Sequence, residues 1–192
     1  MNPIDDPVTS NTLLLLCAEA LRADGATDAG TRVYTPGDGP SQQRTLPQIK
    51  LRLARETRQS LSRSGAPHFR TTATVRILAE AQSYALEDDE GAERAQAAAW
   101  AIKRQVEVAI INSYPLFDVV EQLANMRADL AFNADGALHI AGIQMDLDFE
   151  FYEGAENFAP IFAETISDVL IEPTNYAPAS IIIQQAGDPS SS

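Results

Sequence analysis

The sequence predicts an α+β fold, in which two main helices pack on one face of a mostly antiparallel sheet of four or more strands. Three observations lead to this prediction. Residues 90–114 repeat apolar side chains at spacings of three and four, several segments alternate apolar and polar residues, and the order along the chain is helix, strands, helices, strands. With 192 residues, the chain is long enough for one domain with a substantial core.

The first predicted helix follows residues 1–9, where two prolines and two aspartates indicate a flexible arm. Ser10 or Asn11 can cap this helix by accepting a hydrogen bond from an unpaired backbone N–H. The apolar run TLLLLCAEALRA then continues to a stop at Asp24–Gly25. The single cysteine, Cys17, excludes an internal disulfide and fits a small buried apolar side chain.

Two strands are predicted after a connector rich in glycine and proline. Side chains that share the core face are Ile49, Leu51 and Leu53 in the first strand, and Thr71, Ala73, Val75, Ile77 and Ala79 in the second. Residues 56–68 lose the alternation and contain serines, a glycine and a proline, so they are predicted to form a long loop.

The longest helical pattern covers residues 90–114, where one stripe carries Ala92, Ala95, Ala99, Ile102, Val106, Ala109, Ile110 and Ser113. Trp100 and Ile111 lie about 140° from the centre of that stripe, with Lys103 and Glu107 between them. Two interpretations stay open. The indole is shielded by the stems of its charged neighbours, or this face contacts another subunit, because Trp is enriched at interface centres.

The second half of the domain is predicted to hold a short helix at about 116–124 and a β-hairpin turning at Asp135–Gly136. Gly142 is expected to mark a bulge. In the returning strand, Ile143, Met145, Leu147, Phe149 and Phe151 share one face, and Gln144, Asp146, Asp148 and Glu150 share the other. Residues 154–186 form a C-terminal extension with β-like segments that could pair with a neighbour, and 187–192 a disordered tail.

The sequence offers little for catalysis. His68 and His139 are the only histidines, and each fits a structural or solvated role better than a nucleophilic device. No P-loop, dinucleotide fingerprint or zinc spacing is present. Asp146, Asp148 and Glu150 form a row spaced by about 7 Å, which could bind Mg²⁺ if other strands supplied oxygens. A solvated or ion-paired sheet face is the favoured interpretation, so no catalytic residue, metal or cofactor is predicted.

Charge is unevenly distributed along the chain. The net charge is −13, which argues against tight binding of nucleic acid. No apolar run is long enough for a membrane span. Yet eight of the 14 basic residues lie between Arg44 and Arg76. Strand pairing with the acidic row can use some of them, but not all of Arg55, Arg58 and Arg63 in the predicted loop. A basic projection on an acidic body can dock head-to-tail onto an identical neighbour, which predicts a ring.

These segments together resemble a known family. The helix TLLLLCAEALRA is followed by TRVYTPGDGP, by a strand that begins Leu-Pro (TLPQIKLRL), by one long helix, and by a closing strand with alternating acids (MDLDFEFYE). This order is similar to that of the tail terminator proteins of long-tailed bacteriophages, the minor tail protein U family, over about residues 10–153. The 55–68 loop and the chain after Gly154 are longer than the family's usual plan.

The resemblance implies a structural virion protein without catalytic residues. Its subunits form a hexameric ring on the last ring of tail-tube protein, stop tube growth and provide the surface that joins the head, and DNA later passes through the bore. It also implies the head-proximal end of the tail as the location, and host cytoplasm during assembly. Three alternatives remain: another head–tail connector, neck or tail-tube protein; a metal-dependent hydrolase that uses Asp146, Asp148 and Glu150; and an adaptor that binds a peptide along a strand edge.

Overall fold

The computed structural model describes residues 7–36, 46–62, 65–84, 90–135 and 138–159. The chain divides into two units, Met1–Phe158 and Ala159–Ser192, and the helices and strands given below all belong to the first. Most of the predicted N-terminal arm and nearly all of the predicted C-terminal extension and tail lie outside the described residues, so those assignments stay predictions.

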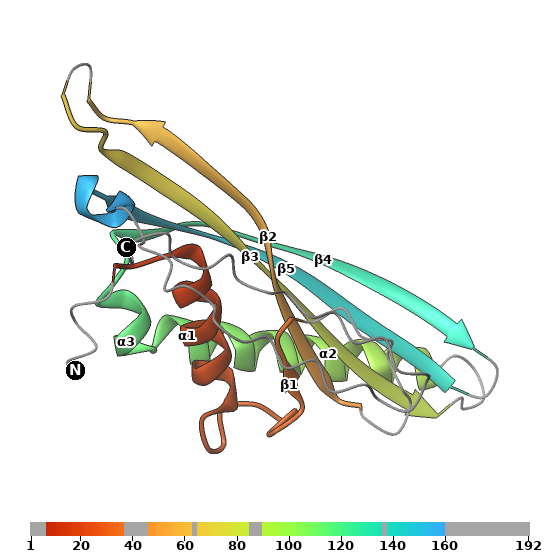
Figure 1. Ribbon diagram of the computed structural model, residues 1–192. Helices are drawn as coiled ribbons and strands as arrows, with labels where there is room; N and C mark the ends of the chain where they lie inside the picture. Colours follow the sequence, from red (N-terminus) through yellow and green to blue (C-terminus); the bar gives the residue numbers. More distant parts are fainter. Residues whose placement is uncertain (1–6, 37–45, 63–64, 85–89, 136–137, 160–192) are drawn as a thin grey trace, which may run out of the picture. The chain divides into compact units, whose positions relative to one another are not determined.

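One sheet and two main helices make up the first unit, which confirms the predicted α+β fold (Figure 1). The elements in chain order are α1 (Ser10–Arg22), β1 (Val33–Tyr34), β2 (Gln48–Ser60), β3 (Phe69–Tyr84), α2 (Glu90–Ile111), α3 (Tyr114–Phe117), β4 (Gln122–Asp135), β5 (Leu138–Glu153) and the 3-10 helix η3 (Ala155–Phe158). The sheet has five strands in the order β1-β2-β3-β5-β4.

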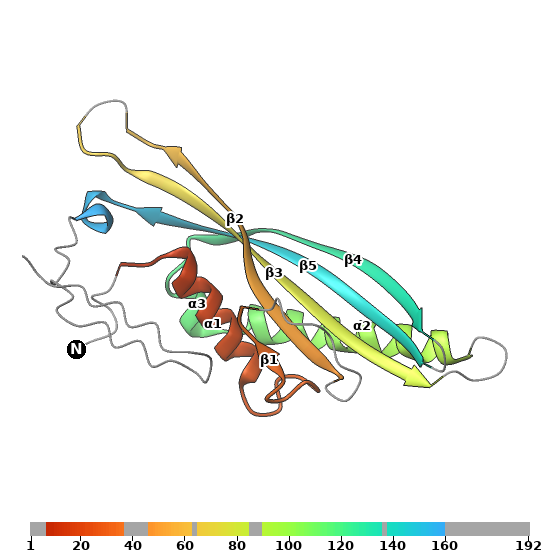
Figure 2. The ribbon, with the colours of Figure 1, turned by 45° about the vertical axis from the view of Figure 1, so that its right-hand side comes forward.

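The sheet is antiparallel except at one edge. β1 pairs in parallel with β2 through Val33 and Tyr34, while β2–β3, β3–β5 and β5–β4 are antiparallel. The helices lie together on one side of the sheet, as Figures 1 and 2 both show. Within the described residues, no helix is long and apolar enough to span a bilayer.

The core lies between the helices and the inner face of the central strands, here called the helix face. The predicted stripe of α2 is buried at Ala95, Ala99, Ile102, Val106 and Ile110. It packs against the alternate residues of β3 and β5 that the sequence assigned to the core, all of which are at most 1% exposed. Each fully buried Leu, Ile or Phe contributes roughly 1.5–3 kcal/mol, so this layer supplies most of the hydrophobic stabilisation.

The N-terminus of α1 differs from the prediction. Thr9, rather than Ser10 or Asn11, caps the helix: its hydroxyl accepts from the Thr12 N–H at 3.1 Å, and the Thr12 hydroxyl accepts from the Thr9 N–H at 3.3 Å. This reciprocal pair is a capping box. Ser10 is left in the first turn, where its hydroxyl donates to Glu56 of β2 instead.

β2 is longer than predicted, and the prediction of a loop over 56–68 is wrong for its first part. The strand continues to Ser60, so the connection covers only 61–68. The pairing register shifts between Leu53 and Arg55, which inserts Ala54 as an extra residue. A bulge of this kind breaks the alternation of two, and for that reason the strand beyond it does not show in the sequence pattern. Leu53, placed in the core by that pattern, is 39% exposed on this edge strand.

Two further predictions for the second half are wrong. The helix expected at 116–124 is only the short α3, Tyr114–Phe117, because β4 already begins at Gln122 and pairs with β5. Gly142 does not mark a bulge, since it keeps register with Glu80 on one side and Ala131 on the other. The bulge in β4 lies between Leu123 and Asn125. The β4–β5 hairpin is confirmed, although Gly136 lies outside the described residues.

Candidate assembly surfaces

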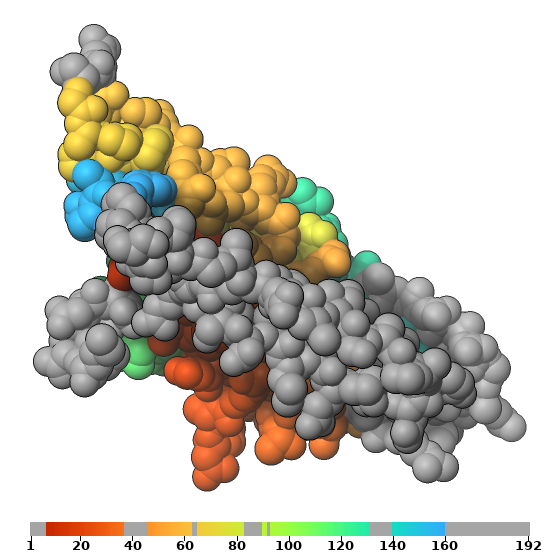
Figure 3. Space-filling view, viewed as in Figure 1, coloured from red at the N-terminus to blue at the C-terminus, as the bar shows by residue number. Residues whose placement is uncertain are grey.

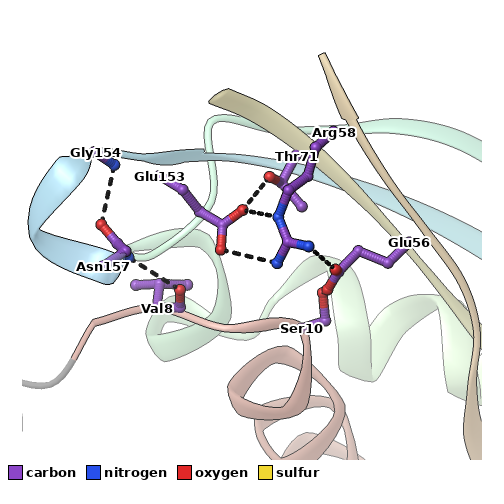
Figure 4. Close-up of polar contacts among 8 residues, drawn as sticks. All are labelled: Val8, Ser10, Glu56, Arg58, Thr71, Glu153, Gly154 and Asn157. Atoms are coloured by element: carbon purple, nitrogen blue, oxygen red, sulfur yellow. Dashed lines mark hydrogen bonds and ion pairs between the residues drawn. The ribbon is translucent and has the colours of Figure 1, made fainter. Parts of the chain in front are cut away.

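A cluster of polar residues lies on the helix face near the end of the sheet (Figure 4). Arg58 donates through Nε to Glu153 Oε2 at 2.7 Å and through Nη2 to Glu153 Oε1 at 3.3 Å. Its Nη1 lies 2.7 Å from Glu56 Oε1. Thr71 donates to Glu153, and Ser10 donates to Glu56. We call Ser10, Glu56, Arg58, Thr71 and Glu153 the Arg58–Glu153 cluster.

The bulge at Ala54 places two of these side chains on the helix face. Past the bulge, Glu56 pairs with Ala73 and Arg58 pairs with Thr71, and both partners are buried residues of that face. Cross-strand neighbours point to the same side of a sheet, so Glu56 and Arg58 also turn towards the helices. Without the extra residue, Glu56 and Arg58 would lie on the outer face of the sheet instead.

The electrostatics of the cluster favour the ionised carboxylate of Glu153, which is only 3% exposed. Burial alone would raise its pKa, but the hydrogen bonds from Arg58 and Thr71 and the charge of Arg58 hold the pKa of Glu153 below its usual value. The same hydrogen bond raises the pKa of the Arg58 guanidinium. The ion pair and the hydrogen bonds are needed here because they offset the cost of taking the charge of Glu153 out of water.

The chain after β5 closes one side of this cluster. The Gly154 N–H donates to Asn157 Oδ1 at 3.0 Å, and Asn157 Nδ2 donates to the Val8 carbonyl at 3.5 Å. The Phe158 ring centroid lies 5.8 Å from the Arg58 guanidinium and 5.5 Å from the Phe69 ring. The start of α1, the end of β5 and the β2–β3 hairpin are therefore held together where the hairpin extends past the helices (Figures 1 and 2).

The predicted acidic row occupies the opposite, outer face of the sheet, and each of its members has partners on neighbouring strands. Arg76 donates to both oxygens of Asp146 at 2.7 Å. Asp148 accepts from Thr74 at 2.5 Å and from Asn125 at 3.3 Å. Glu150 accepts from the Gln122 side-chain amide at 2.7 Å. The hydrogen bond from Arg76, with the nearby charges of Arg127 and Arg55, lowers the pKa of Asp146.

This arrangement is a cross-strand polar ladder. Across the part of the chain that the structure describes, no group of three or more His, Cys, Asp or Glu side chains could hold a metal ion. The acidic face thus fits the ion-paired interpretation favoured from the sequence. It gives the hydrolase alternative no geometric support.

The basic stretch is divided between internal and free charges. Arg55 and Arg58 lie on β2, so placing them in a loop was wrong, and Arg63 lies outside the described residues. Arg58 is engaged by Glu56 and Glu153. Arg52 and Arg55 are exposed, and the structure shows neither an ion pair nor a hydrogen bond for either side chain among the residues it describes. The bulge makes these two arginines successive outward positions on the edge strand.

Both edges of the sheet have long stretches without a neighbouring strand among the residues that the structure describes. β1 pairs only with Ile49 and Lys50 of β2. Past Lys50, no described strand pairs with the free side of β2, and β4 pairs with β5 alone among the described strands. Unpaired N–H and C=O groups on such edges are templates for pairing with another chain.

The second face of α2 is exposed, as expected from its position. Trp100 is 47% and Ile111 is 52% exposed. Lys103 forms an ion pair with Glu107, and its ammonium lies 5.4 Å from the centroid of the Trp100 ring. The lysine stem and head therefore cover part of the indole, and about half of the side chain remains open to solvent.

Sequence reasoning missed the Arg58–Glu153 cluster. Glu153 reads as the last residue of an alternating strand, and Thr71 as a core position of β3. The one available signal was the cluster of arginines in residues that showed no alternation, since a buried carboxylate must find such partners. The strand order determines which carboxylate lies next to Arg58, and the alternation pattern does not predict the strand order.

Comparisons with known proteins do not place the chain in a family. No protein-family model and no curated protein matches the sequence. One solved structure that matches is a chain of the "Virion of native gene transfer agent (GTA) particle", with a TM-score of 0.37 and 16% sequence identity, over 70% of this chain and 91% of that chain. Similarity at this level assigns neither a family nor a function to the chain.

Proposed function

We propose that this chain is a structural virion protein that forms a ring on the end of a tail tube, ends polymerisation of the tube and provides the surface that joins the head. The element order of the fold supports the proposal, because α1, the Val33–Tyr34 pair, β2, β3, α2 and the closing strand β5 follow one another as in the tail terminator proteins that the sequence resembles.

The observation that carries the proposal is that, among the described strands, neither β2 past Lys50 nor β4 has a neighbour on its outer edge. Successive antiparallel pairings from β2 through β3 and β5 to β4 make β2 and β4 run in opposite directions. The free edge of β4 in one copy can therefore pair with the free edge of β2 in the next and continue the antiparallel pattern. Such a contact is head-to-tail, and a head-to-tail contact that closes on itself gives a ring.

The charges on these surfaces support the same assembly. Arg52 and Arg55 are exposed on the β2 edge and form no ion pair with any described residue, and the net charge of the chain is −13, so an identical neighbour is an attractive partner. The strong negative charge also suits a bore through which DNA passes without being held, since a phosphate grip needs clustered Lys and Arg.

Neighbouring functions in the same structural class stay open as proposals, namely another neck or connector protein and a tail-tube subunit, because both also use repeated subunit contacts. An adaptor that binds a peptide along the β2 or β4 edge would use the same free backbone groups. Light scattering separates the adaptor from the ring, because an adaptor stays monomeric at high concentration.

The proposal is tested by electron microscopy and native mass measurement of the purified protein, alone and mixed with tail tubes. We expect closed rings, and decoration of tube tips only. The double variant Arg52→Glu and Arg55→Glu should weaken self-association, whereas Arg94→Glu, an equal charge change on the exposed start of α2, should not. A protein that stays monomeric at high concentration and does not bind tube tips would contradict the proposal.

A further inference from the structure

An apolar groove lies between α1 and the end of α2, continuing into α3. Its volume is about 450 Å³, and Leu16, Ala20, Ala109, Tyr114 and Pro115 contribute to its lining. In this lining the Tyr114 side chain is 78% exposed, so a large aromatic surface remains open to solvent there. Exposed apolar residues gathered around a hollow are a common sign of a protein contact site.

The groove carries negative charge. Glu19 is part of the lining, and Asp24 follows α1 two residues after its end. Both are exposed, and the structure gives neither carboxylate an ion pair or hydrogen bond among the residues it describes. The occupant that fits this groove presents an apolar side chain within a basic segment, because each unpaired carboxylate would then gain a nearby cation.

The end of the β2–β3 hairpin has this chemistry. Leu61 is 49% exposed there, and its N–H donates to the His68 carbonyl at 2.8 Å, which closes the strands at the base of the connection. Residues 55–70 contain four arginines and one glutamate, a net charge of +3 with histidine neutral. Arg58 and Arg70 already form ion pairs within the chain, with Glu153 and Glu121, and Arg55 is exposed without an ion pair among the described residues. Figures 1 and 2 both show the two strands of this hairpin continuing past the helices.

We propose that Leu61 at the hairpin end of one copy inserts into the groove between α1 and α2 of the next copy. The inference rests on the proposed ring and names a second contact within it. One surface meets a different surface of an identical neighbour, so the contact is head-to-tail, like the pairing of sheet edges. The Arg58–Glu153 cluster holds the base of the hairpin, so Leu61 reaches the neighbour from a rigid support.

Cysteine cross-linking tests this contact directly. Leu61→Cys and Ala23→Cys introduce thiols on the hairpin end and in the groove lining, and Ala23 is exposed. The native Cys17 does not interfere, because it is fully buried and burial raises the pKa of its thiol to about 12. Under mild oxidation we expect a covalent dimer when the two single variants are mixed, and a ladder of oligomers from the double variant. Glu93→Cys on α2, in place of Ala23→Cys, should give neither.

A second variant tests the energetics. Leu61→Glu should weaken self-association by about tenfold or more, as expected for loss of an inserted apolar anchor, while leaving the unfolding transition of the monomer unchanged. Gln59→Glu adds the same charge at an exposed position of the same hairpin and should have a smaller effect. If the protein forms rings but Leu61→Cys and Ala23→Cys give no covalent dimer, this inference alone is overturned. A wild-type protein that never forms rings would overturn the proposed function as well.

Discussion

The guanidinium of Arg58 in β2 and the carboxylate of Glu153 at the end of β5 form a two-point ion pair across β3, the strand that lies between them (Figure 4). Thr71 of β3 donates to the same carboxylate. This contact joins three adjacent strands through side chains as well as through the backbone ladder. It lies beside the first turn of α1 near the end of the sheet, so it supports the base of the β2–β3 hairpin with polar contacts.

Removing the charge of Glu153 should destabilise the protein. In Glu153→Gln, one of the two acceptor oxygens becomes an NH₂ donor, so Arg58 loses one of its two hydrogen bonds together with the negative charge of its partner. We expect a loss of about 1–3 kcal/mol, below the figure for fully buried pairs because the Arg58 side chain is 39% exposed. Urea unfolding measures this. Glu19→Gln, the same change at an exposed site, should stay within about 0.5 kcal/mol; equal effects would contradict a special role for the cluster.

Acid should unfold the protein partly through Glu153 and Asp146. The pKa of each is lower in the folded chain than its usual value. Their ionised forms therefore stabilise the fold fully above the unfolded pKa of about 4, and this stabilisation is lost as pH falls through the lowered folded values. We expect the urea midpoint to fall steadily below about pH 5. The decline should be shallower in Glu153→Gln, and parallel curves for the two proteins would rule out this assignment.

Trp100 should matter more for assembly than for folding. Because its side chain is 47% exposed, Trp100→Ala should change the monomer's free energy of unfolding by only about 1 kcal/mol. If the exposed face of α2 contacts a neighbour, the same variant should weaken self-association by about tenfold or more. Analytical ultracentrifugation compares it with Arg94→Ala on the same helix. Unchanged association would leave the shielding of the indole by Lys103 as the better interpretation.

Divalent cations should not bind to the acidic row. Asp146, Asp148 and Glu150 already receive hydrogen bonds from β3 or β4, so a metal ion would have to displace them. We expect no heat on titration with Mg²⁺ or Mn²⁺ and no change in melting temperature with a chelator. Asp148→Asn should behave like the parent protein in both measurements. A saturable binding heat that disappears in this variant would revive the hydrolase alternative.

The regular elements could be predicted because their signals are local. The stripe from Ala95 to Ile110 follows the period of an α-helix, and the alternation from Ile143 to Phe151 follows the period of a strand. Each pattern depends only on which residues meet the core, and the structure buries both as expected. The same alternation places Asp146, Asp148 and Glu150 on the outer face of the sheet, because the polar side of a half-buried strand faces away from the core.

Where a local period was interrupted, prediction failed. Ala54 shifts the register of β2, so the strand up to Ser60 looked like a loop and Arg58 looked like a free loop cation. Residues 116–124 were predicted to be helical, although β4 begins at Gln122, which pairs with Glu150 of β5. In both places, backbone pairing with a distant strand decides the conformation, and short sequence windows do not contain that partner.

The sequence by itself therefore determined the α+β class, the core stripe of α2, the inward faces of β3 and β5, and a net charge of −13. Only the tertiary structure decided the strand order, the bulge in β2 and the contact between Arg58 and Glu153. The reason is that the spacing of buried residues can be seen in consecutive positions of the sequence. The partner of a polar side chain depends instead on which strands become neighbours, and those strands are far apart along the chain.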